Sequence, residues 1–228
     1  MMDHAHDLAC VRDATERLLT AVAELDNASP AEPSRLPGWT RGHIFAHLAR
    51  NADALVNVLE GRPMYTSAEA RDADIEKDAP RPLDEQRTDL RESAARFQEA
   101  GAVPADWSRT VELRNGVTDS AARVPFRRWA EVELHHVDLG IGYELEDLPA
   151  DFTEREIEFL AQRFSGHSEV PATRVTDGTR AWSTGREASG PEVTVSGTPA
   201  DLLGWLAGRR EGAALETKGG ALPTLPPL

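Results

Sequence analysis

The chain has very little cysteine: Cys10 is the only one among its 228 residues. A single cysteine excludes an internal disulfide framework and any cysteine-rich zinc ribbon, and it fits a reducing compartment such as the cytoplasm. Long apolar runs are also missing, and the first residues, MMDHAHDLAC, lack a basic start followed by an apolar stretch. We therefore expect a cytoplasmic protein that is neither secreted nor inserted in a membrane.

Positive charge is scarce as well. The chain has 25 Lys and Arg against 39 Asp and Glu, which gives a formal net charge of -14. This balance argues against a nucleic-acid partner, since phosphate binding needs clustered basic residues. An anionic small molecule would have to be bound by local arginines against the field of the whole protein. The hydrophobic content of 40% is sufficient for a folded core.

The first part of the sequence predicts helices. Apolar residues recur at helical spacing in four segments, at about 8–25, 40–59, 82–101 and 126–141. Thr40 is a suitable N-cap for the second segment, and Pro82 can start the third. Between the third and fourth, Asn115-Gly116 is compatible with a hairpin turn or with a loop. Four amphipathic helices favour an antiparallel four-helix bundle over residues 1–149.

The remaining residues, 150–228, have a different pattern. Thr153 and Glu156 are spaced as a capping box for a fifth helix. The stretches TRVTDGTRAW and EVTVSG alternate and predict antiparallel strands, and ADLLGWLAG predicts a short helix before a last strand in ALETKG. The fold class is therefore α+β, with a helical bundle followed by a small α+β domain.

Two helices carry residues typical of metal ligands. Glu131 and His135 are four residues apart, so they project from one face of a helix. His43 and His47 have the same spacing on the second helix; the spacing does not choose between them, although His47 lies deeper in the helix. Two nitrogen ligands and one oxygen ligand leave a fourth position open, as in a catalytic zinc site. Another divalent ion would also suit these ligands.

Neighbouring residues have expected roles beside these ligands. His136 points about 100° away from His135 and is expected to be packed. Asp138 is placed to orient the distal nitrogen of a ligand, or else is a surface acid. The alternative for Glu131 is an exposed position with a weak ion pair to Arg127 or Arg128. Cys10 is expected to be a small buried hydrophobe.

The sequence is similar to a known family in three stretches: PGWTRGHIFAHLARNADAL, RRWAEVELHHVDLG and VSGTPADLLGWLAGR. They resemble the mycothiol-dependent maleylpyruvate isomerases, which have a DinB-like metal-binding helical bundle and a small C-terminal α/β domain. The resemblance implies His47, Glu131 and His135 as zinc ligands. It also implies a functional arginine at Arg209, with Arg210 as an alternative; a helix C-terminal arginine that complements the dipole is the other interpretation of Arg209.

The resemblance further implies an activity, the cis-to-trans conversion of maleylpyruvate to fumarylpyruvate in the gentisate pathway of aromatic degradation, with mycothiol as thiol cosubstrate. Zinc would favour the thiolate, which adds reversibly to the double bond. The family suggests a monomer. Three alternatives remain at this stage: a mycothiol-dependent S-transferase of the DinB-like group, a zinc hydrolase, and a non-catalytic metal-binding protein.

Overall fold

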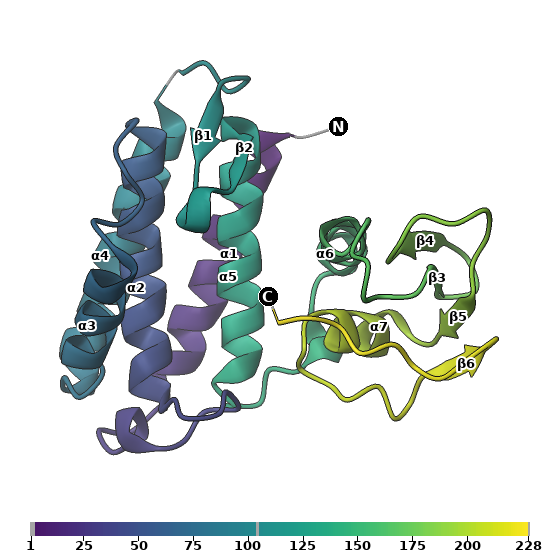
Figure 1. The fold of residues 1–228 in the computed structure, drawn as a ribbon. Helices are drawn as coiled ribbons and strands as arrows, with labels where there is room; N and C mark the ends of the chain where they lie inside the picture. Colours follow the sequence, from purple (N-terminus) through teal and green to yellow (C-terminus); the bar gives the residue numbers. More distant parts are fainter. Residues whose placement is uncertain (1–2, 104, 228) are drawn as a thin grey trace. The chain divides into compact units, whose positions relative to one another are not determined.

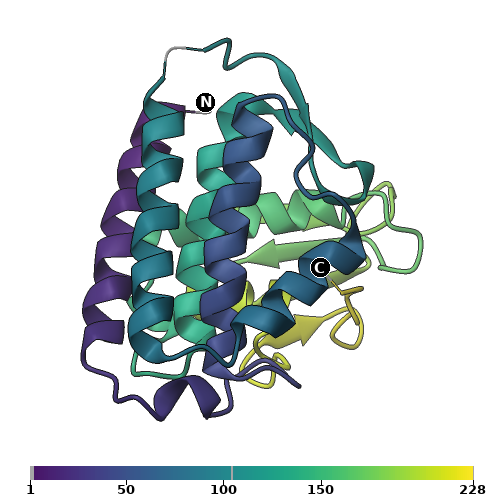
Figure 2. The same ribbon diagram turned by 90° about the vertical axis from the view of Figure 1, so that its left-hand side faces the viewer.

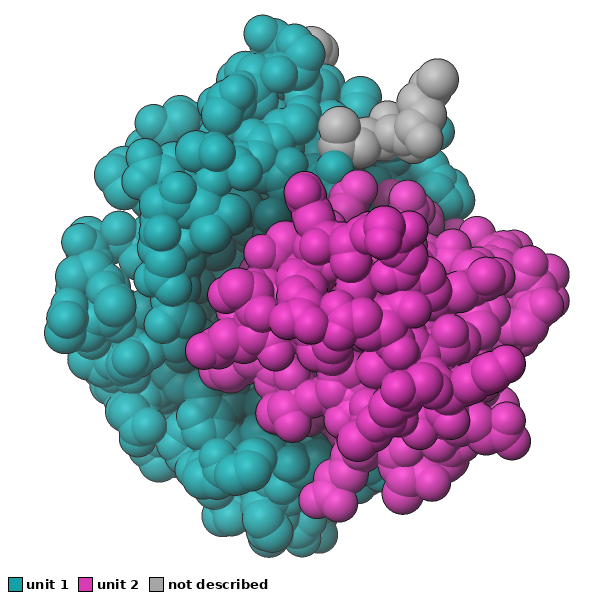
Figure 3. Space-filling model, turned by 45° about the vertical axis from the view of Figure 1, so that its right-hand side comes forward, with its two compact units in different colours: residues 1–143 teal, residues 144–228 magenta. Residues whose placement is uncertain are grey.

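The computed structural model describes residues 3–103 and 105–227, and it divides into two compact units, one up to Tyr143 and one from Glu144 (Figure 3). The first unit is helical and the second contains a small sheet (Figure 1). This confirms the expected α+β class. Residues 144–149, which the sequence placed with the bundle, belong to the second unit. None of the helices in the described part of the chain combines the length and apolar character that crossing a bilayer requires.

Four long helices form the first unit: α1 (His4–Ala23), α2 (Arg41–Leu59), α4 (Leu83–Ala102) and α5 (Val124–Asp138). Their apolar stripes meet in a core that includes the fully buried side chains Leu18, Ile44, Phe45, Leu48, Phe97 and Trp129. α1 packs on α4 and α5, and α2 packs on the same two helices. α2 and α4 run in the same direction (Figure 2), so the bundle is not antiparallel throughout.

The connection between α2 and α4 contains a helix that the sequence pattern did not predict, α3 (Ala68–Asp78). It returns the chain to the end of the bundle where α2 begins, which lets α4 run parallel to α2 (Figure 2). The junction is tight at Gly42, where an added Cβ would lie 2.1 Å from the carbonyl oxygen of Ala79. A side chain at position 42 would therefore separate the start of α2 from the end of α3.

The segment before α5 forms a hairpin of β1 (Thr110–Glu112) and β2 (Thr118–Ser120), which resolves the ambiguity in favour of strands. A 3₁₀ turn, η2 (Arg114–Gly116), joins them. Asn115 and Gly116 both have positive φ, 60° and 71°, a conformation that these two residue types tolerate best. Short 3₁₀ segments also lie at Ser29–Ala31 and Ala121–Arg123.

The second unit contains a 3₁₀ turn (Leu145–Asp147), α6 (Ala150–Arg163), α7 (Pro199–Leu206) and the strands β3 (Thr173–Thr176), β4 (Ala181–Thr184), β5 (Val193–Ser196) and β6 (Glu216–Lys218). The strand order is β4-β3-β5-β6. The prediction of antiparallel strands was wrong for one pair, because β5 lies parallel to β3. The chain crosses over after β4 and adds β5 on the other edge of β3.

The expected capping box of α6 was also wrong. The helix begins at Ala150, with Pro149 at the N-cap, so Thr153 lies inside the first turn. Its hydroxyl donates to the carbonyl oxygen of Pro149 at 3.1 Å. Proline sets φ near -55° and favours an extended ψ, and this starts the helix before the threonine. Thr198 caps α7 by accepting from the amide of Asp201.

Candidate metal centre

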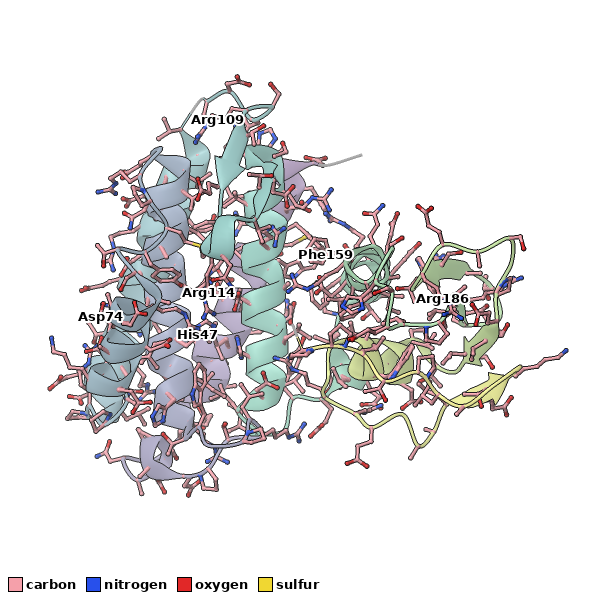
Figure 4. The ribbon with its side chains drawn as sticks, in the orientation of Figure 1. His47, Asp74, Arg109, Arg114, Phe159 and Arg186 are labelled. Atoms are coloured by element: carbon pink, nitrogen blue, oxygen red, sulfur yellow. The ribbon has the colours of Figure 1, made fainter. Side chains whose placement is uncertain are left out.

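Three side chains of the first unit converge between α2 and α5. Nε2 of His47 lies 2.9 Å from Oε2 of Glu131, and Nε2 of His135 lies 3.3 Å from the same oxygen. The candidate ligand atoms all lie within 4.8 Å of one another. His47 is labelled in Figure 4. The structure therefore brings together the three residues that the resemblance implied as ligands.

Each ligand takes its position from its helix. Glu131 and His135 are one turn apart on α5, so both side chains face α2. His47 lies in the second turn of α2, which packs against α5, and its side chain is buried. The cluster thus depends on regular helix geometry and on the packing of two helices.

His43 has another partner. Its Nδ1 accepts from the amide of Thr40 at 3.1 Å and lies 2.8 Å from the Thr40 hydroxyl, which completes a capping box at the start of α2. Its Nε2 lies 3.4 Å from Oε2 of Glu76 on α3. The ring of Trp39 stacks on His43 at 6.0 Å and lies 5.5 Å from the ring of His47. Of the two histidines that spacing left open, the structure places His47 in the cluster and uses His43 as a cap.

Asp138 supports the cluster. Its carboxylate is fully buried, and Oδ2 lies 2.9 Å from Nδ1 of His135. A carboxylate at the distal nitrogen fixes the tautomer that leaves Nε2 as the ligand atom. His136 is buried elsewhere, with its ring stacked on that of Tyr143 at 4.1 Å. His136 is packed as expected, and of the two interpretations left open for Asp138 the structure favours the one beside the ligand over the surface acid.

The alternative interpretation of Glu131 does not hold. Arg127 pairs with Asp119 at 2.7 Å, and Arg128 is buried, donating to the carbonyl oxygen of Leu48 and to Asn51 at 2.8 Å each. The partners of Glu131 are instead the two imidazoles.

The electrostatics of the cluster favour an ionised Glu131 carboxylate beside a neutral His47 imidazole. Burial alone would raise the pKa of Glu131, but the hydrogen bonds from His135 and His47 outweigh it and hold that pKa well below its usual value. Burial lowers the pKa of His47 to about 4. Burial also acts to lower the pKa of His135, but Asp138 and Glu131 together raise it above its ordinary value.

This donor set fits a divalent cation. Two imidazole nitrogens and one carboxylate oxygen are the usual protein ligands of a catalytic zinc ion, and the histidine at position 135 has the carboxylate support that such ligands show. A cation would also compensate the charge of a largely buried carboxylate. Cys10 does not contribute to this cluster. It is partly exposed on α1, with Sγ 3.4 Å from Nε2 of His6, so the prediction of a buried hydrophobe was wrong.

Comparison with known proteins agrees with this geometry. Residues 11–140 match the mycothiol maleylpyruvate isomerase N-terminal domain, and residues 147–227 match the MDMPI C-terminal domain. The chain belongs to the mycothiol maleylpyruvate isomerase family. A crystal structure of the mycothiol-dependent maleylpyruvate isomerase is similar, with 29% identity and a TM-score of 0.89. A structure of a histidine-to-alanine mutant of the mycothiol-dependent maleylpyruvate isomerase has 28% identity and a TM-score of 0.88.

Both alignments cover 99% of this chain and 97% of the other. No curated protein matches the chain. The likeness to the family therefore extends over both units, while the contacts of each residue come from the present structure.

The second unit of this family member carries the two candidate arginines after α7. Arg210 is held by two carboxylates: it donates to Asp201 at 2.7 Å and to both oxygens of Glu146 at 2.7 and 2.8 Å. Arg209 donates to the carbonyl oxygen of Ala207 at 2.7 Å. Arg210 thus links α7 to the Leu145–Asp147 turn within the unit, whereas Arg209 is half-buried and bonds to its own helix end.

One residue near the metal centre was missed in the sequence. Arg71 on α3 places a guanidinium nitrogen 3.2 Å from Nδ1 of His47, and the guanidinium lies 6.0 Å from the centre of the Tyr65 ring. α3 has almost no apolar stripe, so periodicity could not indicate that it packs near the ligands. The excess of acidic residues made every arginine a candidate for binding an anionic ligand, but no sequence spacing distinguished Arg71 from the others.

Proposed function

We propose that the protein is a zinc- and mycothiol-dependent isomerase that converts maleylpyruvate to fumarylpyruvate in the gentisate pathway. The observation that carries this proposal is the His47, Glu131 and His135 cluster, found in a chain that aligns over 99% of its length with a mycothiol-dependent maleylpyruvate isomerase. The single cysteine favours a reducing compartment, and we assign the enzyme to the cytoplasm as a monomer.

The chemistry follows from the stiffness of a carbon-carbon double bond. A thiolate that adds to the cis double bond converts it to a single bond, and the negative charge moves onto the oxygen of the adjacent carbonyl group. After rotation about that bond, the same charge expels the thiolate and restores the double bond as trans. A divalent cation held by His47, Glu131 and His135 would favour the thiolate at neutral pH, since coordination lowers the pKa of a thiol.

The residues of the chain have distinct tasks in this scheme. His47, Glu131 and His135 hold the cation, and Asp138 keeps Nε2 of His135 available as a ligand atom. Arg209 binds the anionic substrate and stabilises the enolate-like charge that develops during addition. The resemblance assigns this role to Arg209, whereas Arg210 pairs with Glu146 and Asp201 within the second unit.

The test is turnover of maleylpyruvate by metal-analysed protein with and without mycothiol, following both product geometry and free thiol. We expect thiol-dependent formation of the trans isomer with no net loss of thiol. His47→Ala should abolish turnover. His43→Gln is the matched control. It removes a histidine one turn away from His47, and the glutamine retains an acceptor for the helix cap. Steady consumption of thiol would instead identify an S-transferase, and turnover without thiol would identify a hydrolase.

The two neighbouring arginines provide a second matched pair. Arg209→Ala should reduce turnover strongly while zinc content and melting temperature stay close to those of the wild type. Arg210→Ala should lower the stability of the second unit, because Glu146 and Asp201 lose their shared partner. Full activity of the Arg209 variant would remove this residue from the mechanism.

A further inference from the structure

The two histidines of the metal centre have opposite partners at their distal nitrogens. Nδ1 of His135 faces the carboxylate of Asp138, which can act only as a hydrogen-bond acceptor. Nδ1 of His47 faces the guanidinium of Arg71 at 3.2 Å, and arginine has only donors. In the present arrangement Nδ1 of His47 must therefore accept, and its ring proton is on Nε2, directed at Glu131 at 2.9 Å.

This arrangement conflicts with metal binding by His47. A cation bound at Nε2 takes the place of the proton there, so the neutral ring carries its proton on Nδ1. Nδ1–H and the guanidinium N–H of Arg71 are then two donors facing each other. Ligating histidines usually donate this proton to a carboxylate, a carbonyl or water, and a guanidinium can accept nothing. Arg71 must leave His47 when the cation binds.

A cavity lies beside Tyr65, a residue that both Arg71 and Arg114 approach. Its volume is about 630 Å³, and it lies between the end of α2, residues 61–68 and the β1-β2 hairpin, with Tyr65 in its wall. The guanidinium of Arg71 lies 6.0 Å from the Tyr65 ring. Burial and then the charge of Glu131 raise the pKa of Tyr65, so its phenol remains a hydrogen-bond donor. Arg71 therefore contacts a residue of the metal centre, His47, and a residue of the cavity wall, Tyr65.

The cavity wall has more basic than acidic residues in a protein whose net charge is -14, since Glu112 is the one acidic residue among those that line it. Three arginines line it (Arg62, Arg109 and Arg114), and Figure 4 labels the last two. Arg109 is committed to the carbonyl oxygens of Val58 and Leu59, and Arg62 pairs with Glu60. Arg114 is exposed in the hairpin turn, and no salt bridge involves it among the described residues. Arg114 is thus the cation of this wall that remains available for a ligand.

We propose that Arg71, together with Arg114 and Tyr65, binds a carboxylate of the anionic substrate, and that Arg71 exchanges His47 for this carboxylate when the metal centre is loaded. The inference rests on the proposed function for the class of ligand, a small dicarboxylate or 2-oxo acid. Arg71 keeps one guanidinium nitrogen on Asp72 at 2.6 Å, and the nitrogen that faces His47 is the one the exchange releases. That nitrogen, the guanidinium of Arg114 and the phenol of Tyr65 are donors, so an anion is the ligand that satisfies them together. Because Arg71 leaves His47 only when the cation is bound, this exchange makes substrate binding depend on an occupied metal centre.

The first test measures zinc affinity with a competing chelator dye, without substrate or thiol. Arg71→Met removes both the competing hydrogen bond and a cation close to the metal, so we expect zinc to bind about two- to tenfold tighter than in the wild type. A residue that merely supported the His47 ring would give the opposite result. Unchanged or weaker zinc binding would overturn the exchange.

The second test measures maleate binding to the zinc-loaded protein by calorimetry, in the absence of thiol. Arg71→Met and Arg114→Met should each weaken maleate binding about tenfold or more. Arg71→Lys, which keeps the charge and loses the planar fork, should give an intermediate affinity, and it remains informative if the methionine variant does not fold. Arg12→Met, an exposed arginine of α1 that pairs with Asp13, is the control and should bind as the wild type does.

The outcomes separate this inference from the proposed function. Wild-type isomerase activity with unchanged maleate affinity in both cavity variants would overturn the anion site and leave the function intact. Loss of mycothiol affinity with unchanged maleate affinity would also overturn it, because the cavity would then hold the thiol. If the wild type does not isomerise maleylpyruvate but maleate binding still depends on Arg71, the anion site stands and the assigned reaction fails.

Discussion

Helix α5 carries two largely buried carboxylates with opposite uses. Glu131 and Glu133 are two residues apart, so they point in directions roughly 200° apart around the helix. Glu131 faces α2 and has two imidazole partners, His47 and His135. Glu133 faces α1. Arg17 of α1 and Trp129 of α5 donate to its Oε1 at 2.5 and 2.9 Å, and Tyr143, which follows α5, donates to its Oε2 at 2.8 Å.

The difference lies in the chemistry of the partners. An imidazole can give up its proton and offer a lone pair in its place, so the Glu131 cluster can change from a hydrogen-bonded group to a set of metal ligands. Guanidinium and indole have no lone pair to offer, and burial raises the pKa of the Tyr143 phenol, so the Glu133 cluster remains a permanent link between α1 and α5. Burial of a carboxylate therefore does not indicate function by itself. What indicates function is whether the neighbouring groups can lose a proton and bind a metal ion.

The strongest test of this comparison removes one carboxylate charge. Glu131→Gln should weaken zinc binding by at least about a thousandfold, since even residues that only support ligands contribute 10- to 100-fold. The measurement is competition with a chelator dye at pH 7.5. Glu133→Gln is the matched control on the other face and should leave zinc affinity within about twofold. Equal zinc affinities in the two variants would remove the metal centre from this position.

The two variants should rank in the opposite order when the free energy of unfolding is measured: Glu133→Gln should be the more destabilising. Glu133→Gln places an amide group against the donors of Trp129 and Tyr143, and it removes the charge that pairs with Arg17. We expect a loss of about 3 kcal/mol in the free energy of unfolding, measured by urea denaturation of metal-free protein. Arg17 is 41% exposed and can rehydrate, which limits the loss. If Glu133→Gln lost less free energy of unfolding than Glu131→Gln, the permanent structural role of the Glu133 cluster would be contradicted.

Asp138 should show a smaller effect on the metal side. Asp138→Asn retains an acceptor for Nδ1–H of His135 but removes the charge that increases the basicity of the ring. We expect zinc affinity to fall about tenfold, with circular dichroism unchanged. Unaltered affinity would mean that this buried carboxylate holds the helix end and does not act on the ligand.

Much of the metal centre could be predicted because it depends on local periodicity. The four-residue spacing of Glu131 and His135, and the different directions of His136 and Asp138, follow from helix geometry alone. The choice of His47 over His43 required a different signal, which was present: Thr40 three residues before His43 marks a capping box in which histidine replaces the usual glutamate or glutamine. The two histidines of α2 were candidates from their spacing, and only the assignment of His47 came from the family resemblance.

The features that were missed depend on long-range packing. α3 is polar around most of its surface, so Arg71 carried no sign of its place beside His47. The parallel pairing of β3 and β5 arises from the crossover after β4, which alternation within a strand cannot reveal. The α6 start was misplaced because Thr153 and Glu156 satisfied a capping pattern while Pro149 had already begun the helix. Local patterns identified element types, and competing local signals shifted a boundary.

The smallest expected effect concerns His136, which shares α5 with both carboxylates. Its ring stacks on Tyr143 and is buried, and burial followed by the charge of Arg17 lowers its pKa to about 4. His136→Phe preserves an aromatic ring for the stack. At pH 7.5 we expect zinc affinity to be unchanged and the free energy of unfolding to move by no more than about 1 kcal/mol.

Acidification should then separate the variant from the wild type. The folded-state pKa of His136 is below its unfolded value of 6.5, so the stability from its neutral ring is complete above pH 6.5 and is lost as the pH falls toward 4. Phenylalanine does not titrate, and the variant should gain about 1 to 2 kcal/mol on the wild type between pH 7 and pH 5, measured on metal-free protein. His47 has the same sensitivity, but it is present in both proteins and cancels in the difference. If the free energy of unfolding depended on pH in the same way in the two proteins, His136 would be hydrated in the fold. If the variant bound zinc more weakly, the two faces of α5 would not be independent.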